Sequence, residues 1–290
     1  MKAFRGRTAV ITGGASGIGL ALAHRLAREG MRLVLADVEA PALRAAVEKL
    51  EAAGAEVRGI VTDVASFESV QALETEAVRT FGRVHVLCNN AGVGALEDVP
   101  VWELPLNDWR WTFGVNLWGV IHGIKAFLPG MLAHGEEGHV VNTSSGNGGL
   151  LLIPGTPIYA TSKSAVSALT ELLHLQLTER GAKIRASVLY PGPHLVASNI
   201  FSAARNRPAG LTREVPQIAP PVTLETMKTL AQQAGRTLET TSPEEVAETC
   251  LAGLVADAFY ILPESPETDA RFRERMENVL ARRNPDPPAF

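Results

Sequence analysis

Three polar residues in the second half of the chain have the types and spacing of a proton-transfer site. Tyr159 and Lys163 stand four positions apart in the segment YATSK, so on a helix they share one face. The ordinary pKa of a tyrosine is about 10, and a neighbouring ammonium favours the phenolate that a base needs near neutral pH. Ser145 ends the segment HVVNTSS, where its hydroxyl is placed to donate to a carbonyl oxygen that gains charge. An exposed Tyr/Lys pair and a serine in a strand-end turn are the structural alternatives.

A glycine-rich segment near the N-terminus predicts a nucleotide site. TGGASGIG follows an apolar run and contains Gly13, Gly17 and Gly19. A turn without side chains between a strand and a helix lets backbone N–H groups approach a pyrophosphate. The spacing differs from G-x-G-x-x-G, so a tight turn without a ligand stays open as an alternative.

An acidic residue after the next apolar run strengthens the nucleotide prediction. Asp37 lies about 20 residues after Gly17, where an acid meets the adenosine ribose of NAD. Its carboxylate would repel a 2′-phosphate, and neither Ser16 nor Val38 brings a compensating positive charge. We therefore expect NAD rather than NADP. Asp63 follows a later run, either as a further cofactor residue or as the cap of the helix after it.

Short apolar runs alternate with helical patterns along the chain. The runs cover residues 8–12, 32–37, 56–63, 84–90, 139–145, 184–191 and 258–263. Helical patterns between them end at Gly30, Gly54 and Gly82. The alternation predicts an α/β fold, a single-domain Rossmann-type doubly wound parallel sheet of about seven strands with helices on both faces. Ligands bind such sheets at the carboxyl ends of the strands.

Two segments depart from this rhythm. Prolines interrupt residues 195–242, which we interpret as a substrate-binding lid, and the charged residues 264–285 predict a C-terminal helical extension of the same domain, 1–290. The uncharged stretch 140–162 has the length of a membrane span, but its glycines, prolines and hydroxyl groups favour a buried strand and a loop.

The composition favours a small-molecule partner. The net charge is −4 without a run of like charges, which argues against a nucleic-acid arm, and no membrane partner is expected. Cys88 and Cys250 are too few for a disulfide framework and predict packing roles in a reducing compartment. No apolar signal segment precedes the first glycines, so we expect a cytoplasmic protein. The histidines lack metal-ligand spacing, and no metal is expected.

Together these motifs resemble the short-chain dehydrogenase/reductase family over nearly the whole chain. The matching segments are TGGASGIG, Asp63-Val64, NNAG at 89–92, Asn116 in VNLWG, Ser145, YATSK and Pro191-Gly192. The resemblance implies that Tyr159 is the general acid/base, that Lys163 lowers its pKa and holds the nicotinamide ribose, and that Ser145 orients the substrate. It also implies that Asn116 helps to hold a water in a proton relay. The cofactor-binding residues that we predict are Gly13, Ser16, Gly17, Ile18, Gly19, Asp37, Asp63, Val64, Asn90, Ala91, Gly92, Tyr159, Lys163, Pro191 and Gly192.

The chain departs from the family pattern in three places. The interval from Ser145 to Tyr159 is one residue longer than usual, so Ser144 stays a second candidate and the intervening loop must bulge. After Pro191-Gly192 the usual Val-x-Thr is displaced, which leaves Ser198 for the carboxamide contact and His194 as either a ligand contact or a loop residue. The family's glycine-rich C-terminal tail is replaced by a charged helix, which puts tetramer contacts made by that tail in doubt.

The predicted activity is the NAD(H)-dependent interconversion of a hydrophobic secondary alcohol and a ketone. Apolar residues at 92–96, 150–154, Leu195, Val196, Ile200 and Phe201 are expected either to face the substrate or only to pack the lid. The later segments resemble an NAD-dependent branch of the family that has a C-terminal extension and includes aryl-alcohol and lignin-fragment dehydrogenases. The alternatives are a non-catalytic dinucleotide sensor, an NADP(H)-preferring carbonyl reductase and, less favoured, a nucleotide-sugar epimerase. The family implies a homodimer or a homotetramer.

Overall fold

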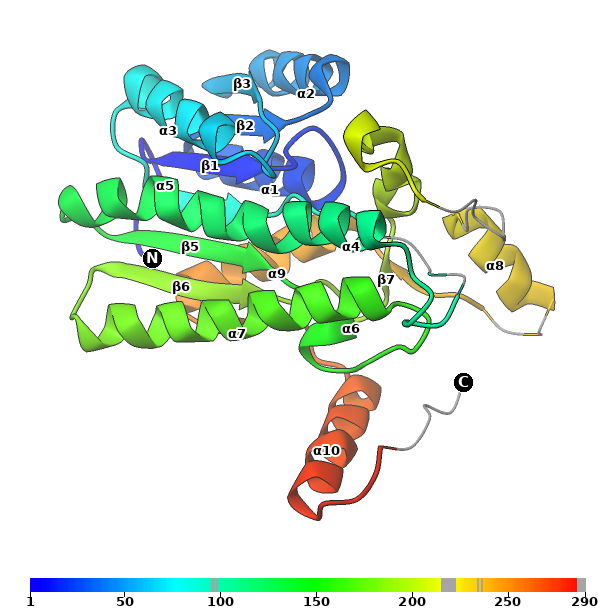
Figure 1. The fold of residues 1–290 in the computed structure, drawn as a ribbon. Coiled ribbons are helices and arrows are strands. Elements are labelled where there is room, and N and C mark those ends of the chain that lie inside the picture. The colour runs from blue at the N-terminus through cyan, green and yellow to red at the C-terminus, as the bar shows by residue number, and fades with distance from the viewer. Residues whose placement is uncertain (95–96, 98, 215–222, 234, 236, 286–290) are drawn as a thin grey trace.

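A parallel sheet forms the centre of the computed structural model, which describes residues 1–94, 97, 99–214, 223–233, 235 and 237–285 (Figure 1). Within these residues seven strands pair in the order β3-β2-β1-β4-β5-β6-β9, all parallel. The strands are β1 (Thr8–Thr12), β2 (Arg32–Asp37), β3 (Val57–Val61), β4 (Val86–Asn89), β5 (Gly138–Thr143), β6 (Ile184–Leu189) and β9 (Tyr260–Ile261). The predicted fold class is confirmed.

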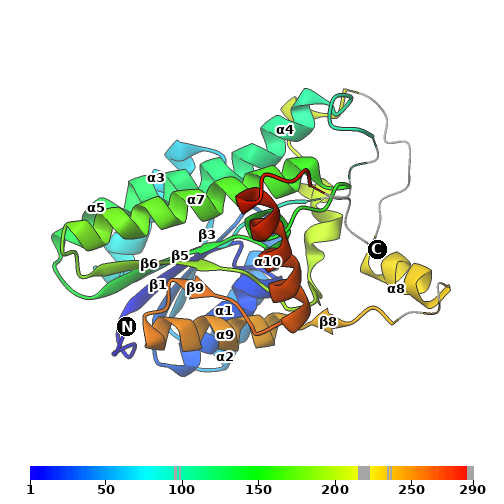
Figure 2. The ribbon, with the colours of Figure 1, turned by 90° about the horizontal axis from the view of Figure 1, so that it is seen from below.

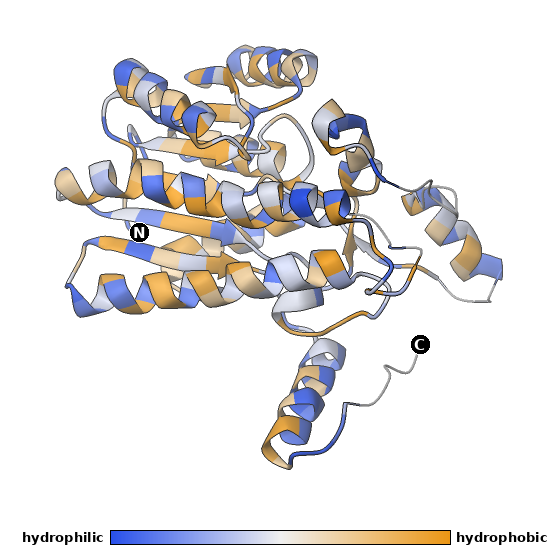
Figure 3. Ribbon diagram, in the orientation of Figure 1, coloured by the Kyte–Doolittle hydropathy of each residue, from blue (hydrophilic) through white to orange (hydrophobic). Residues whose placement is uncertain are grey.

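Helices cover both faces of the sheet, as the turned view shows (Figure 2). One layer contains α3 (Phe67–Phe81), α5 (Gly119–Ala133) and α7 (Pro157–Glu179), and the other contains α1 (Gly17–Arg28), α2 (Ala40–Ala52) and α9 (Pro243–Ala256). Alternate strand residues serve the two layers. Ala9 and Ile11 of β1 join the apolar cluster under α1 and α9, whereas Val10 joins the cluster under α3, α5 and α7. The strands are accordingly apolar along most of their length (Figure 3).

Local signals fix where several helices begin and end. Ser66 caps α3 by accepting a hydrogen bond from the Ser69 N–H at 3.2 Å, and Ser242 forms a capping box with Glu245 at the start of α9. Gly30, Gly54 and Gly82 have φ angles of 77°, 85° and 76°, a backbone conformation that favours glycine at a helix end. The three predicted helix ends are confirmed.

The connections at the carboxyl ends of the strands contain the remaining elements. They are α4 (Leu106–Phe113), the π-helix η1 (Gly114–Trp118), α6 (Gly146–Gly149), β7 (Leu195–Val196), the 3₁₀ helices η2 (Asn199–Asn206) and η3 (Ala209–Leu211), α8 (Leu224–Gln233), β8 (Thr240–Thr241) and α10 (Pro266–Leu280). The sequence analysis did not predict α8. Several predicted strands were too long at this edge, because residues after 61, 89, 143 and 189 leave the sheet to form the pocket.

The uncharged stretch 140–162 contains most of β5, then α6 and the first turn of α7. Among the described residues, no helix combines the length and the apolar character needed to cross a bilayer. Cys88 and Cys250 are both buried as free thiols, in agreement with the predicted packing roles.

Buried His139 of β5 makes stability depend on pH. It is 1% exposed, its Nε2 lies 2.6 Å from the Ser187 Oγ, and burial lowers its pKa to about 3. In the unfolded chain the pKa is about 6.5, so between these values the unfolded state binds the extra proton and stability falls as the pH falls. Between pH 7 and pH 5 we expect the unsubstituted protein to lose about 2 kcal/mol more unfolding free energy than His139→Gln, because the variant has no imidazole to protonate.

Urea denaturation at both pH values measures this difference. The comparison at pH 7, where His139 is mainly neutral in both states, gives mostly the packing change. Equal losses in the two proteins between pH 7 and pH 5 would exclude His139 as the titrating group.

Candidate active site

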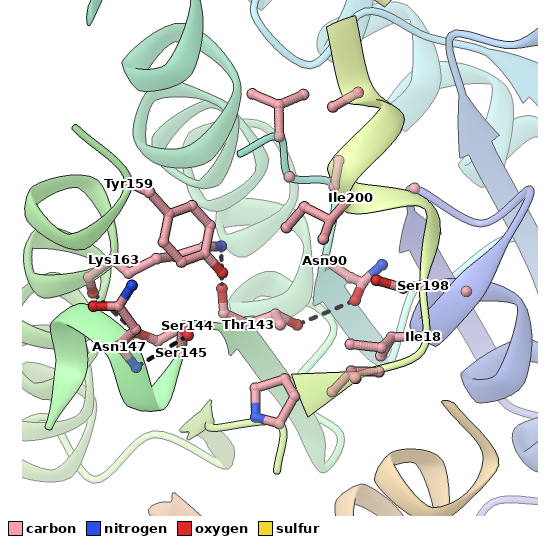
Figure 4. A pocket seen from close by; sticks show the side chains of 18 of the residues that line it. Ile18, Asn90, Thr143, Ser144, Ser145, Asn147, Tyr159, Lys163, Ser198 and Ile200 are labelled. Carbon is pink, nitrogen blue, oxygen red and sulfur yellow. Dashed lines mark hydrogen bonds between the residues drawn. The ribbon is translucent and has the colours of Figure 1, made fainter. Parts of the chain in front are cut away.

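A cavity of about 1150 Å³ opens at the carboxyl ends of the strands. It lies at the point where the strand order changes direction, between β1 and β4, which is the usual ligand position in such sheets. The turn after β1, the ends of β2 to β6 and the segment around η2 all contribute to its lining. Figure 4 shows side chains from both halves of the chain pointing into this space.

The glycine turn brings bare backbone to the cavity wall. A Cβ on Gly13 would lie 2.9 Å from the Cα of Ala91, and one on Gly19 would lie 2.0 Å from the Gly13 carbonyl oxygen. Gly13 and Gly17 have φ angles of 66° and 52°. Within the described chain the Ser16 hydroxyl makes no capping bond to α1. The first N–H groups of helix α1 are therefore left for a ligand anion. Ser16, Gly17 and Ile18 line the cavity, and this arrangement fits a pyrophosphate.

Asp37 is fixed beside the glycine turn by backbone donors. The Ala15 N–H donates to its Oδ2 at 3.1 Å, and the Glu39 N–H donates to its Oδ1 at 3.0 Å. Burial raises the pKa of this carboxyl, while the two backbone hydrogen bonds lower it. The carboxyl faces the same cavity as the glycine turn, which suits recognition of a ribose.

Asp63 and Val64 line the cavity after β3. The Asp63 Oδ1 accepts a hydrogen bond from the Ala65 N–H at 2.9 Å, whereas Ser66 caps α3. The interpretation of Asp63 as the helix cap is therefore wrong. Its role at the cofactor stays a prediction.

Thr12 organises the loop that follows β4. Its hydroxyl accepts hydrogen bonds from the Asn90 and Ala91 N–H groups at 3.0 and 3.1 Å, and the Asn90 Nδ2 donates to the Thr12 carbonyl at 3.1 Å. These bonds hold Asn90, Ala91 and Gly92 against the glycine turn. This role of Thr12 was not predicted from the sequence, although a hydroxyl at the end of an apolar strand was the available signal.

Tyr159, Lys163 and Ser145 meet in the cavity (Figure 4). The Ser145 hydroxyl lies near enough to the Tyr159 phenol to influence its pKa. The Lys163 Nζ lies 5.8 Å from the centre of the Tyr159 ring and donates to the Thr143 carbonyl at 2.9 Å. The Ser144 hydroxyl instead donates to the Lys163 carbonyl at 2.9 Å. The geometry therefore favours Ser145 over Ser144 as the partner of Tyr159.

The electrostatics of this cluster follow from burial. Burial raises the pKa of the Tyr159 phenol, and the nearby Ser145 hydroxyl lowers it in part. Burial also lowers the pKa of Lys163 to about 8. The phenol of the protein alone is therefore protonated near neutral pH, the form that a general acid requires. This direction is opposite to the lowering that the family resemblance implies, so action as a base requires positive charge beyond that of Lys163.

Asn116 is completely buried in the π-helix η1. Its Nδ2 donates to the Val93 carbonyl at 2.9 Å and to the Ser162 Oγ at 3.0 Å, and its Oδ1 accepts from the Val93 N–H at 2.8 Å. The side chain thus ties η1 to α7 and to the loop after β4. The π-helix that contains it is a feature frequent at functional sites. The predicted part of Asn116 in a proton relay stays a prediction.

Comparisons with known proteins agree with this geometry. Residues 7–207 match the family model described as short chain dehydrogenase. The chain belongs to this family. A short-chain dehydrogenase/reductase from Burkholderia phymatum, solved in complex with NAD, is 42% identical and superposes with a TM-score of 0.89 over 100% of both chains.

Two curated relatives are also similar. The 1-deoxy-11-beta-hydroxypentalenate dehydrogenase of Streptomyces avermitilis is 42% identical over 185 residues, which is 64% of this chain and 67% of the relative. The C alpha-dehydrogenase of a Sphingobium species is 34% identical over 97% of this chain and 87% of the relative. Family membership and these relatives identify the chain as an oxidoreductase that acts on CH–OH groups.

This short-chain dehydrogenase differs from the family pattern after β6. Pro191 and Gly192 line the cavity as predicted, and so does His194, whose Nε2 lies 3.0 Å from a Glu239 oxygen. Ser198 packs over Gly17 in the glycine turn, where a Cβ on the glycine would lie 3.3 Å from the serine Cβ. The carboxamide contact of Ser198 stays a prediction.

The apolar residues predicted near the substrate are only partly at the cavity. Leu150, Leu151, Ile153, Leu195, Val196 and Ile200 line it, but Phe201 and Leu152 are not among the described lining residues. Positions 95 and 96 of the predicted wall lie outside the described residues. The loop before α7 bulges as expected, since Asn147 holds it through the Thr156 hydroxyl at 2.7 Å and the Ile153 N–H at 3.2 Å.

The role of Thr12 in this short-chain dehydrogenase is testable by one methyl-for-hydroxyl exchange. Thr12→Val leaves the Asn90 and Ala91 N–H groups without their acceptor, so we expect a loss of about 2–3 kcal/mol of unfolding free energy. Thr12→Ser keeps the hydroxyl and is the matched control, with a loss below about 1 kcal/mol. Urea denaturation measures both variants, and equal stabilities would refute the assignment.

Proposed function

We propose that this protein is an NAD(H)-dependent dehydrogenase that interconverts a hydrophobic secondary alcohol and its ketone. The observation that carries the proposal is the presence of Tyr159, Ser145 and Lys163 in one cavity with the glycine turn, with the Lys163 ammonium 5.8 Å from the centre of the Tyr159 ring. A non-catalytic sensor has no need of a buried ammonium next to a phenol. We therefore favour catalysis over cofactor sensing.

The side chains have separate tasks in the proposed reaction. The Ser145 hydroxyl orients the substrate oxygen by a hydrogen bond, and the Tyr159 phenol donates a proton to that oxygen in reduction or accepts one in oxidation. Lys163 adds positive charge that favours the phenolate, and its ammonium is held by the Thr143 carbonyl. The nicotinamide, when bound, supplies or accepts the hydride. Asn116 and η1 keep α7 in register with the loop after β4.

The residues of the adenosine end support NAD(H) as the cofactor. Asp37 presents a carboxylate where a 2′-phosphate would be repelled, and the Burkholderia phymatum relative was solved with NAD. We propose that Gly13, Ser16, Gly17, Ile18 and Gly19 hold the pyrophosphate. Asp63, Val64, Asn90, Ala91 and Gly92 then face the adenine and its ribose, and Pro191 and Gly192 face the nicotinamide.

The substrate end of the cavity is apolar and is closed in part by the C-terminal helix. Leu150, Leu151, Ile153 and Leu262 line it, and α10 adds Thr268 and Arg271. The Arg275 Nη1 donates to the Leu150 carbonyl at 2.7 Å, and Phe272 packs on the cluster of Leu150, Val188 and Tyr190. A hydrophobic alcohol fits such a wall, and two relatives are named as dehydrogenases.

We also propose a homodimer. Leu172 and Leu175 of α7 and Trp118 of η1 are 57%, 56% and 53% exposed, which leaves apolar side chains on one helical layer without cover. Light scattering of the purified protein tests this part of the proposal, and a monomer at micromolar concentration would contradict it.

An absorbance screen of hydrophobic ketones and alcohols with NAD(H) and NADP(H) tests the reaction. We expect turnover with NAD(H), and a loss of kcat on the order of 10³-fold in Tyr159→Phe, which removes the transferable proton. NADH binding, followed by fluorescence, should survive the substitution. Full activity of Tyr159→Phe would refute the proposed mechanism.

The two adjacent serines give a matched pair of variants. Ser145→Ala should lower kcat by about 10²-fold, because it removes the donor to the substrate oxygen. Ser144→Ala should keep kcat within about threefold and lower stability by about 1 kcal/mol, because its hydroxyl only bonds α7. The opposite pattern of kcat values would assign the substrate contact to Ser144.

The α10 wall predicts a change in substrate affinity. Arg275→Met removes the bond to the Leu150 carbonyl, so we expect KM for a bulky substrate to rise about fivefold with little change in kcat. Arg273→Met on the exposed side of α10 is the control. If the two variants have the same KM, α10 does not shape the substrate site.

A further inference from the structure

One ion pair ties η2 to the start of α2 across the adenosine end of the cavity. Glu39 precedes α2 and stands two residues after Asp37. The Arg205 Nη2 and Nε donate to the two Glu39 oxygens at 2.5 and 3.2 Å, and the Asn206 Nδ2 donates to Glu39 at 2.7 Å. Glu39, Arg205 and Asn206 all line the cavity. The pair therefore stands where the cofactor's adenosine ribose is proposed to bind.

The Arg205 guanidinium is held in place by its own helix as well. Its Nη1 donates to the Ser202 carbonyl and hydroxyl oxygens, both at 2.8 Å. The opposite edge of the guanidinium, Nε and Nη2, is the edge that Glu39 occupies. Without the Glu39 carboxylate, that edge would stay at the cavity wall with its donors unpaired.

Around the proposed ribose position two carboxylates, of Asp37 and Glu39, face one guanidinium, of Arg205. The Glu39 N–H donates to Asp37, so two carboxylates lie close together here, and the charge of Glu39 is one cause of the raised pKa of Asp37. The hydrogen bond with Arg205 lowers the pKa of Glu39, which is therefore ionised near neutral pH. Among the described lining residues the other cations are engaged elsewhere or come from distant elements: Lys163 bonds Thr143, Arg110 bonds Asn107, and Arg271 belongs to α10.

We propose that Glu39 sets the cofactor preference by occupying Arg205, the guanidinium that a 2′-phosphate would otherwise bind. Arginine binds phosphate and carboxylate through the same paired donors, so the Glu39 carboxylate takes the position of a phosphate. Through this pairing Glu39 holds η2 over the adenosine end when the ribose carries no 2′-phosphate. Its negative charge also adds to the repulsion of a 2′-phosphate by Asp37. This inference rests on the proposed NAD(H) function and assigns Glu39 and Arg205 as specificity-determining residues.

Binding titrations of NADH and NADPH, followed by fluorescence without substrate, test the inference. In Glu39→Gln we expect the Kd for NADPH to fall about tenfold, because Arg205 is released and one negative charge is removed, while the Kd for NADH changes less than about threefold. In the double variant Glu39→Gln/Arg205→Met the gain in NADPH binding should disappear.

Glu248→Gln is the matched control, since it also breaks a surface Arg–Glu pair. Glu248 accepts from the Arg25 Nε at 2.7 Å, and neither residue lines the cavity within the described chain. Both Kd values should stay at those of the unsubstituted protein. Melting temperatures confirm that each variant is folded, and Glu39→Ala replaces Glu39→Gln if the latter is not.

Two results would overturn the inference. One is an unchanged ratio of NADPH to NADH affinity in Glu39→Gln. The other is a gain in NADPH binding that persists in the double variant, because the loss of negative charge alone would then explain it. Failure of the unsubstituted protein to bind NADH would instead contradict the proposed function.

Discussion

The site depends on a close approach of backbone segments between β1 and β4. Gly19 lies so near the Gly13 carbonyl, and Gly13 so near Ala91, that neither position has space for a Cβ. The Thr12 hydroxyl completes this contact by accepting the N–H groups of Asn90 and Ala91. Two turns far apart in the sequence thus form one wall of the cavity. The rest of the cavity is connected to this wall through the sheet and through Asn116.

The side chains proposed for catalysis depend on a second contact, between α7 and the end of β5. The Lys163 ammonium donates to the Thr143 carbonyl, and the Ser144 hydroxyl donates back to the Lys163 carbonyl. Because β5 is also paired with β4, the position of Lys163 is linked through the sheet to the glycine turn. Asn116 adds a third link by bonding the loop after β4 to Ser162 of α7. The phenol, the ammonium and the turn are therefore parts of one rigid arrangement.

The sequence predicted this arrangement where chemistry and spacing are local. Apolar runs gave the sheet, glycines gave the helix ends, and the interval in YATSK gave the shared face of Tyr159 and Lys163. Contacts between distant residues were not predictable in the same way. The role of Thr12, the choice between Ser145 and Ser144 and the pairing of Glu39 with Arg205 depend on which side chains the fold brings together. Helix α8 was missed because its few apolar positions, in a proline-rich segment, form no long periodic pattern.

The electrostatics of the cavity suggest why the two ends differ. At the end that contains Tyr159, the buried Lys163 ammonium has a backbone carbonyl as its hydrogen-bond partner among the described residues, and burial lowers its pKa to about 8. Lys163 has no carboxylate partner among the described residues, and this suits its proposed role beside a titrating phenol, because a permanent negative charge nearby would favour the ammonium at all times. At the adenosine end Arg205, which holds η2 in place, is paired with the Glu39 carboxylate. The same kind of charged group thus has a different environment at each end, which fits the proposed proton transfer at one end and the proposed selection of the cofactor at the other.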